Sequence, residues 1–197
     1  MARFVEHDER REGIIENALD VFIEVGFESA TFQKIADRAR VTRTILYQYF
    51  KDKLELFHFS IKHFLGHLEE DITGIDRAKS AVEKLILIIR AVFTRLEKNR
   101  KLLIVILNFI VNNYKDTDTS SIKYYISRRT IRFRRKIAVI VIDGINSGEL
   151  RAVKVHTVNE IIFSFIEAAV LELAVLKKEN LRSALSNFES CIKLFAK

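Results

Sequence analysis

The spacing of apolar residues along this chain predicts helices from one end to the other. Apolar side chains recur every three or four residues, the period that gives an α-helix one apolar side. The pattern favours two short helices between residues 31 and 50, and longer helices near 8–25, 53–71, 80–98, 100–114, 122–146, 155–178 and 180–195. The 197 residues include no proline, which also favours long uninterrupted helices. We therefore expect an all-α fold, with a boundary between two parts of the chain near Gly74.

The two short helices stand out because one side of the second helix is polar. Thr31 and Thr42 are the expected N-caps, and a turn near Arg40 separates the helices. A further helix opens at Asp52, where Glu55 can complete a capping box. The second short helix turns Val41, Ile45, Leu46 and Phe50 inward and leaves a strip of Arg43, Thr44, Tyr47 and Gln48. Arginine and glutamine can pair with base edges, and hydroxyl groups can reach phosphates, so this strip is typical of a DNA recognition helix.

The run Leu46-Tyr-Gln-Tyr-Phe50, the Lys51-Asp-Lys-Leu-Glu55 that follows it, and the Gly26–Phe27 pair resemble the TetR/AcrR family of bacterial transcription regulators. The resemblance is specific over about residues 10–58. Two positions depart from the family pattern. Arg40 stands in a turn that usually carries glycine, so we expect a left-handed residue there at a cost of about 1 kcal/mol. Thr44 stands where the family often has glycine, which concerns base preference and not the fold.

The resemblance implies an N-terminal helix-turn-helix DNA-binding domain at 1–52, a linking helix at 53–71, and a C-terminal helical ligand-binding and dimerisation domain at 72–197. It implies a homodimeric repressor that binds a palindromic double-stranded DNA operator and leaves it when an inducer binds. The expected base-facing residues are Gln33, Arg43, Thr44 and Gln48. The expected contacts to phosphates or base edges are Thr31, Thr42, Tyr47, Tyr49 and Lys53. Tyr47 and Tyr49 could instead be packing residues.

The C-terminal helices carry more apolar surface than one core requires. The helix at 155–178 is apolar on more than one side, and the helix at 180–195 has a continuous apolar stripe. A second subunit could cover the excess, and the expected dimer interface comprises Phe165, Ala169, Leu181, Leu185, Phe188 and Ile192. An apolar effector pocket is expected to be lined by Phe93, Phe109, Phe133 and Phe163, with a filled core as the alternative.

The formal net charge of +7 is distributed unevenly. Residues 1–58 hold nine Lys or Arg against eleven Asp or Glu, whereas residues 77–151 hold seventeen against six. Any case for DNA binding must therefore be local to the short helices, because the N-terminal part as a whole is acidic. The densest basic run, Arg128 to Lys136, is either a solvated helix face or a port for an anion such as a carboxylate, phosphate or coenzyme A. The apolar pocket predicts a lipophilic effector. If the basic run binds that effector, one end of the molecule is expected to be anionic.

Other classes of site find little support in the sequence. His63, His67 and Asp71 are spaced as cation ligands could be, but they lie off the apolar face of their helix, which favours a solvated face and no metal site. No phosphate loop, nucleophile elbow or metalloprotease motif is visible, so we expect neither an enzyme nor a bound cofactor. An architectural DNA-binding protein without a small-molecule ligand is the alternative function.

The sequence also bears on the expected compartment. A single cysteine, Cys191, allows no intramolecular disulfide, which suits a reducing cytoplasm. The longest strongly apolar stretch, 161–176, is interrupted by Glu167 and Glu172 and is shorter than the roughly 20 residues that a bilayer span needs. We therefore expect a cytoplasmic protein with no membrane partner.

Overall fold

The computed structural model describes residues 2–70, 75, 78–113 and 120–197, which fold into two compact units. The first unit contains the chain up to residue 67 together with residues 104–123, and the second contains residues 68–103 and 124–197. The expected all-α class is confirmed, and no β-strand is found in the described residues. The helices are α1 (Ala2–Ser29), α2 (Phe32–Ala39), α3 (Arg43–Tyr49), α4 (Lys53–Glu70), α5 (Ala81–Lys98), α6 (Arg100–Asn112), α7 (Ser120–Asn146), α8 (Val155–Ala174) and α9 (Arg182–Lys193).

The two compact units do not coincide with the ranges expected from the sequence. Most of α6 belongs to the first unit, although 72–197 was expected to form one C-terminal domain. The physical reason is a cluster of aromatic rings: Phe109 of α6 lies 4.6 Å from Phe27 of α1 and 4.9 Å from Phe57 of α4, measured between ring centroids. Helical spacing identifies Phe109 as a buried residue, but it does not identify the helices against which the ring packs.

The first unit is built around the apolar side of α1. Phe22 is fully buried and packs on Phe57 with a centroid distance of 4.8 Å. The helix kinks at Gly26, whose φ of 77° is one that a residue with a Cβ rarely adopts. The chain then turns into α2, which packs against α1, with α3 next to α2. Helix α1 begins at Ala2 and not at residue 8 as expected, so the charged N-terminal residues are helical as well.

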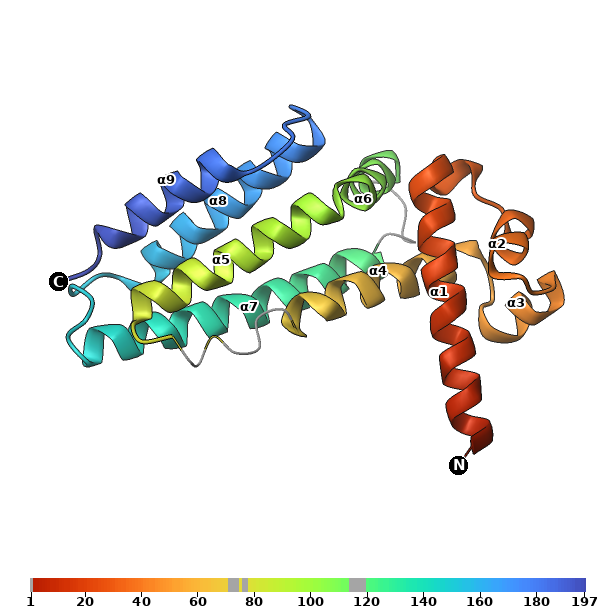
Figure 1. Cartoon of the computed structure of the whole chain (residues 1–197), viewed down its shortest axis with the longest axis horizontal. Helices are drawn as coiled ribbons and strands as arrows, with labels where there is room; N and C mark the ends of the chain where they lie inside the picture. Colours follow the sequence, from red (N-terminus) through yellow and green to blue (C-terminus); the bar gives the residue numbers. More distant parts are fainter. Residues whose placement is uncertain (1, 71–74, 76–77, 114–119) are drawn as a thin grey trace. The chain divides into compact units, whose positions relative to one another are not determined.

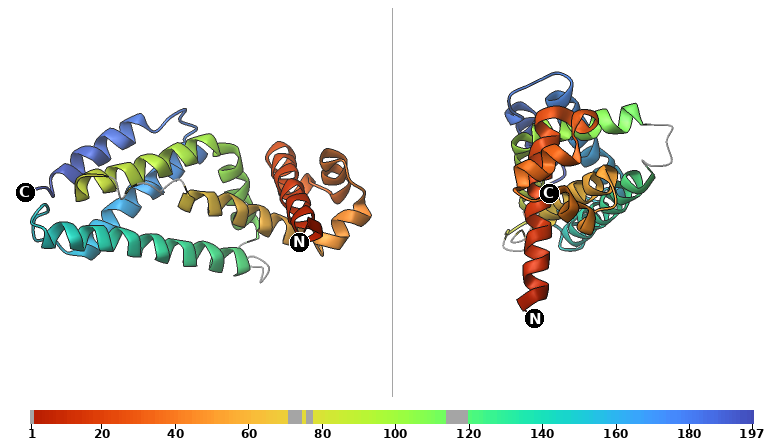
Figure 2. Two further views of the ribbon diagram at one scale, coloured as in Figure 1. Left: turned by 60° about the horizontal axis from the view of Figure 1, so that its bottom comes forward. Right: turned by 90° about the vertical axis from the view of Figure 1, so that its right-hand side faces the viewer.

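The second unit is a bundle in which α5, α8 and α9 lie side by side, with α7 along the same core (Figures 1 and 2). The sequence pattern anticipated these helices, since α5 and α8 begin within one residue of the expected positions. Their apolar faces meet in a core whose fully buried members include Ile89, Ile137, Ile162, Phe188 and Ile192.

Several helix ends of the second unit are satisfied by side chains from distant parts of the chain. Glu149 accepts a hydrogen bond from the backbone N–H of Ala81 at the start of α5, at 2.6 Å. Glu97 accepts one from the N–H of Leu181 at the start of α9, at 2.5 Å. Arg100 donates to the carbonyl of Leu173 near the end of α8, at 3.0 Å. The terminal backbone groups that a helix cannot pair internally are therefore paired by its neighbours.

Candidate nucleic-acid interface

The outer face of α3 presents four polar side chains to solvent. Arg43, Thr44 and Gln48 are exposed, and Tyr47 retains 54% of its accessible surface. The same helix is anchored by Leu46, which is fully buried. A seven-residue helix with one buried anchor and a polar outer strip is the arrangement that the sequence predicted for this segment. It can offer hydrogen-bond donors and acceptors to the edges of base pairs in a major groove.

The turn that sets α3 against α2 has the expected caps. The Thr31 hydroxyl accepts a hydrogen bond from the N–H of Lys34 at 3.2 Å, and the Thr42 hydroxyl accepts one from the N–H of Ile45 at 3.3 Å. Between them Arg40 adopts φ 55° and ψ 41°, the left-handed conformation expected from its place in the turn. Both threonines are exposed, so each hydroxyl lies at the surface as well as capping a helix.

Neighbouring side chains hold the polar strip in place. Arg43 donates to the Tyr47 hydroxyl at 3.3 Å, and the Tyr47 ring packs against Phe32 of α2 at 4.9 Å. Gln33 of α2 is exposed and donates to Asp37 at 2.7 Å. These contacts limit the positions that the Arg43 and Gln33 side chains sample, which lowers the entropy lost when they bind a partner.

Tyr49 lies in a different environment from Tyr47. It is half-buried, and its ring lies 4.5 Å from the imidazole ring of His7 on α1. The structure therefore gives Tyr49 a packing contact within the unit. Its expected contact with a phosphate or base edge stays a prediction.

Lys53 has a structural role that sequence reasoning missed. Its ammonium group donates to the carbonyls of Phe27 at 2.8 Å and Glu28 at 3.2 Å, and it lies 4.3 Å from the centre of the Phe27 ring. The start of α4 is thereby tied to the end of α1, across 25 residues of sequence that no helical spacing links. An ammonium group has three donors, so two carbonyl contacts still allow the phosphate contact predicted for Lys53.

The expected capping box at the start of α4 is present, but one of its two hydrogen bonds is displaced by one residue. The Asp52 carboxylate accepts a hydrogen bond from the N–H of Glu55 at 2.8 Å. The Glu55 carboxylate reaches back to the N–H of Lys51 at 2.5 Å, one residue before the position that the motif specifies. The start of α4 is therefore held by two reciprocal side-chain contacts.

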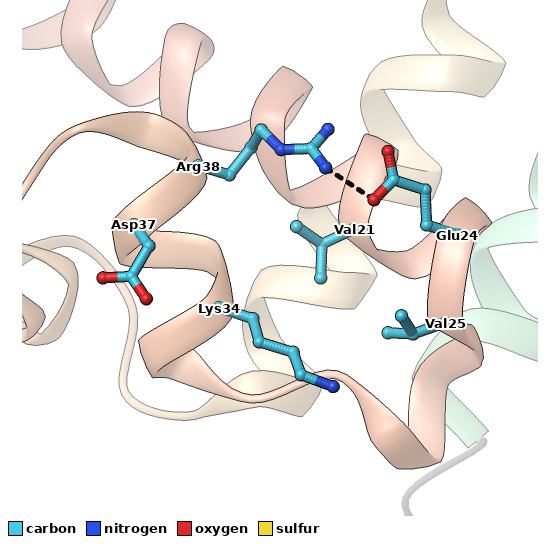
Figure 3. A pocket seen from close by; sticks show the side chains of 6 residues that line it. All are labelled: Val21, Glu24, Val25, Lys34, Asp37 and Arg38. Carbon is cyan, nitrogen blue, oxygen red and sulfur yellow. Dashed lines mark hydrogen bonds and ion pairs between the residues drawn. The ribbon is translucent and has the colours of Figure 1, made fainter.

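A cleft of about 440 Å³ lies between α1 and α2, and Figure 3 shows the side chains around it. Arg38 reaches across from α2 to the Glu24 carboxylate of α1 at 2.5 Å, and Asp20 lies 4.0 Å away. The hydrogen bond and the negative charge of Glu24 raise the pKa of Arg38 above its usual value. Most of the lining is charged, so this cleft does not match the lipophilic effector expected from the sequence.

Only three of the four phenylalanines expected in an effector pocket share one core. Phe93 and Phe163 are buried in the second unit, and Phe133 packs against Phe163 with a centroid distance of 5.9 Å. Phe109 is not with them, because its ring lies in the aromatic cluster of the first unit. The effector pocket expected from the sequence is therefore restricted to Phe93, Phe133 and Phe163.

The residues expected at a dimer interface lie mostly inside the chain's own core. Four are buried: Ala169, Leu181, Phe188 and Ile192. The other two, Phe165 and Leu185, are half-buried against the same core, and Phe165 packs on Phe188 at 5.4 Å. An apolar stripe in the sequence does not reveal whether its partner is in the same chain. The four buried residues are therefore not available to a second copy, whereas the interface contacts expected of Phe165 and Leu185 stay a prediction.

Side chains of α8 contact one end of the basic run on α7. Arg134 pairs with Glu160 at 2.5 Å and stacks over the Phe163 ring at 3.9 Å. Arg129 donates to the Tyr125 hydroxyl at 2.7 Å, whereas Arg135 and Lys136 are exposed. Part of the run is therefore a solvated face and part packs beside Phe163, while its expected role as an anion port stays a prediction.

The structure also bears on metal binding and on membrane insertion. No group of three or more His, Cys, Asp or Glu side chains is placed to hold a metal ion in the parts of the chain that the structure describes. Of the candidate ligands, His63 lies 3.9 Å from Glu16, while the side chains of His67 and Asp71 fall outside the described residues. Across the same described segments, no helix is both long enough and apolar enough to span a bilayer.

Comparison with known proteins gives matches at two levels. The model of the family of bacterial regulatory proteins named tetR matches residues 14–58. The fatty acid metabolism regulator protein of Bacillus subtilis strain 168 is 29% identical over 180 residues, which cover 88% of both chains. Two other curated regulators are 37% and 40% identical over 71 and 80 residues, so that the chain spans only 31% and 38% of their lengths.

Solved structures show the same fold over nearly the whole chain. A TetR transcription regulator from Haloarcula marismortui has a TM-score of 0.86 at 16% identity, covering 96% of this chain and 100% of that one. The transcriptional regulator FadR from Bacillus subtilis, solved in complex with stearoyl-CoA, has a TM-score of 0.66 at 25% identity, covering 92% and 96%. The helix-turn-helix geometry, the family match at residues 14–58, the similarity to a curated regulator over 88% of both chains and the fold shared with solved TetR regulators together indicate a TetR-family transcriptional regulator.

Proposed function

We propose that this protein is a homodimeric repressor that binds a palindromic DNA operator and releases it when a long-chain acyl-coenzyme A binds. The observation that carries the DNA-binding part is the outer face of α3, where Arg43, Thr44, Tyr47 and Gln48 are exposed on a helix anchored by Leu46. Gln33 joins Arg43, Thr44 and Gln48 as a proposed contact to base edges, and Thr31, Thr42, Tyr47, Tyr49 and Lys53 are the proposed contacts to phosphates or base edges. The protein acts in the cytoplasm, where its operator lies.

Four observations support an acyl-coenzyme A as the effector. One relative is named a fatty acid metabolism regulator, and a structural neighbour was solved with stearoyl-CoA bound. In this chain, Phe93 and Phe163 contribute to a large apolar core in the second unit, which suits a hydrocarbon chain. The exposed basic residues of α7, among them Arg135 and Lys136, suit the phosphates of coenzyme A.

Dimerisation is proposed through the outer faces of α8 and α9. Leu171 on α8 retains 51% of its accessible surface, Val175 just after α8 retains 62%, and Leu194 just after α9 retains 71%. Ser164 and Ala168 lie on the same side of α8 as Leu171, so a partner helix could approach closely there. Two-fold symmetry gives a dimer two recognition helices, which doubles the number of base pairs read.

The interface can be tested with one substitution on the exposed side of α8 and one on the buried side of α9. Leu171→Glu places a charge on the proposed interface without disturbing the core, so we expect a folded monomer in analytical ultracentrifugation. Phe188→Glu puts an unpaired charge into the chain's own core and is expected to unfold the protein, at a cost of several kcal/mol. A stable dimer of the Leu171→Glu variant would contradict the proposed interface.

The DNA-binding proposal is tested by selecting binding sites from a random pool of duplex DNA. Enrichment of a palindrome is the expected outcome, and the affinity for it can then be measured by fluorescence anisotropy. Arg43→Ala should weaken binding by about 1 to 3 kcal/mol and relax the preference at one base pair in each half-site. The matched control is Arg182→Ala, which removes an equal charge from an exposed position on α9. Equal losses in both variants would contradict the assigned role of Arg43.

The effector proposal is tested on the same complex. Stearoyl-CoA should release the operator, whereas coenzyme A alone should not, because it lacks the hydrocarbon chain. Release by neither compound, with operator binding intact, would favour an architectural or constitutive DNA-binding protein.

A further inference from the structure

Asn159 is a polar residue in an otherwise apolar part of the second unit. Its side chain retains only 7% of its accessible surface, and its Oδ1 atom is buried without a hydrogen-bond partner. Ser60 is similarly buried, but its hydroxyl donates to the carbonyl of Leu56 at 2.9 Å and is therefore satisfied within its own helix. An unpaired amide in an apolar core destabilises a fold, so a leucine at position 159 would serve packing better.

The position of Asn159 on α8 connects it with the proposed effector site. It lies on the same side of the helix as Ile162, Phe163 and Ile166, which belong to the core of the second unit. Phe163, one turn further along, contacts Phe133 of α7, and Arg134 of α7 stacks over the Phe163 ring. Asn159 thus lies one turn of α8 from Phe163, the ring that Phe133 and Arg134 contact and that is proposed to hold the acyl chain.

We propose that Asn159 is the polar anchor of the effector, and that its side chain pairs with a secondary amide next to the acyl thioester. This inference rests on the acyl-coenzyme A function proposed above. A carboxamide has both N–H donors and a carbonyl acceptor, so it matches the carbonyl and N–H of a secondary amide. A free carboxylate has only acceptors and would leave Oδ1 unpaired. The first amide of the pantetheine arm is the group of this chemistry that an acyl-coenzyme A carries close to its acyl chain.

Two small thioesters isolate this contact. S-decanoyl-N-acetylcysteamine has one secondary amide beside the thioester, and S-ethyl decanethioate has the same acyl chain without the amide. Isothermal titration on the full-length protein should show roughly 3- to 10-fold tighter binding of the amide-bearing compound. In Asn159→Leu the two compounds should bind equally, because the leucine side chain cannot pair with the amide. Decanoyl-CoA and decanoate complete the series.

The stability of the variant separates an effector contact from a merely structural role. Asn159→Leu should unfold at the same or a higher temperature than the parent protein without ligand, and it should gain less from the amide-bearing thioester. If Asn159→Leu does not fold, Asn159→Ala provides the same comparison between the two ligands. A preference for the amide that persists in the variant would overturn the role of Asn159 alone. Failure of the parent protein to bind stearoyl-CoA as well as the three decanoyl thioesters would overturn this inference and the proposed effector together.

Discussion

Replacing Arg40 tests whether the turn between α2 and α3 stores backbone strain. Arg40 is exposed and left-handed, at φ 55° and ψ 41°. Arg40→Ala and Arg40→Gly both remove the guanidinium group, so they differ only in the presence of a Cβ. The left-handed conformation costs a residue with a Cβ about 1 to 2 kcal/mol. Glycine loses roughly 0.5 to 1 kcal/mol more entropy on folding, so the middle values of the two ranges leave a net advantage of about 0.75 kcal/mol for glycine.

This difference is large enough to measure by denaturation. For a protein of this size, 1 kcal/mol shifts the unfolding midpoint by about 2 to 4 °C, so Arg40→Gly should melt about 1 to 4 °C above Arg40→Ala. The matched control is Ala39→Gly, one residue earlier at the end of α2, where the backbone is helical. There glycine should lower stability by up to about 1 kcal/mol. If glycine lowers stability at both positions, or if Arg40→Ala melts above Arg40→Gly, the argument from backbone strain is wrong.

Three further changes probe the packing and the ion pairs, each followed by urea denaturation. Phe109→Ala should destabilise the protein by about 3 to 5 kcal/mol, since the ring is 3% exposed and packs on two others; a loss below about 1 kcal/mol would contradict this. Gly144→Ala should cost about 1 to 3 kcal/mol, because a Cβ there would lie 2.6 Å from the Cβ of Ala81. Its control Gly13→Ala, with no atom within 4 Å of the new Cβ, should be neutral or stabilising. Arg38→Ala should leave the urea midpoint nearly unchanged, since its ion pair is exposed, and a clear drop in the midpoint would show a structural role for the pair.

The sequence predicted most of what depends on local spacing. The caps at Thr31 and Thr42 follow from residue types within four positions of one another, the left-handed Arg40 follows from the family resemblance, and the structure contains all three. The exposed strip on α3 follows from the same periodicity, because a helix with one apolar side must place its remaining side chains outward.

The features that the sequence did not predict depend on partners far along the chain. The tie between Lys53 and the end of α1, and the ion pair between Arg38 and Glu24, join residues that no helical period relates. The same limit explains the dimer interface. Periodicity showed that Phe188 faces apolar surroundings, but only the packing of α9 on α5 shows that these surroundings belong to the same chain.

The remote capping of helix ends in the second unit has a consequence for how that unit opens. Amide hydrogens at the start of a helix usually exchange with solvent by local fraying, because they have no intrahelical partner. The amides of Ala81 and Leu181 are instead held by Glu149 and Glu97, which come from other parts of the bundle. Their exchange with deuterium therefore requires whole elements to separate, whereas the amide of Arg182, bonded only to nearby Asn180, can exchange by fraying. Adjacent amides at the start of α9 should thus report two different motions, one local and one of the whole bundle.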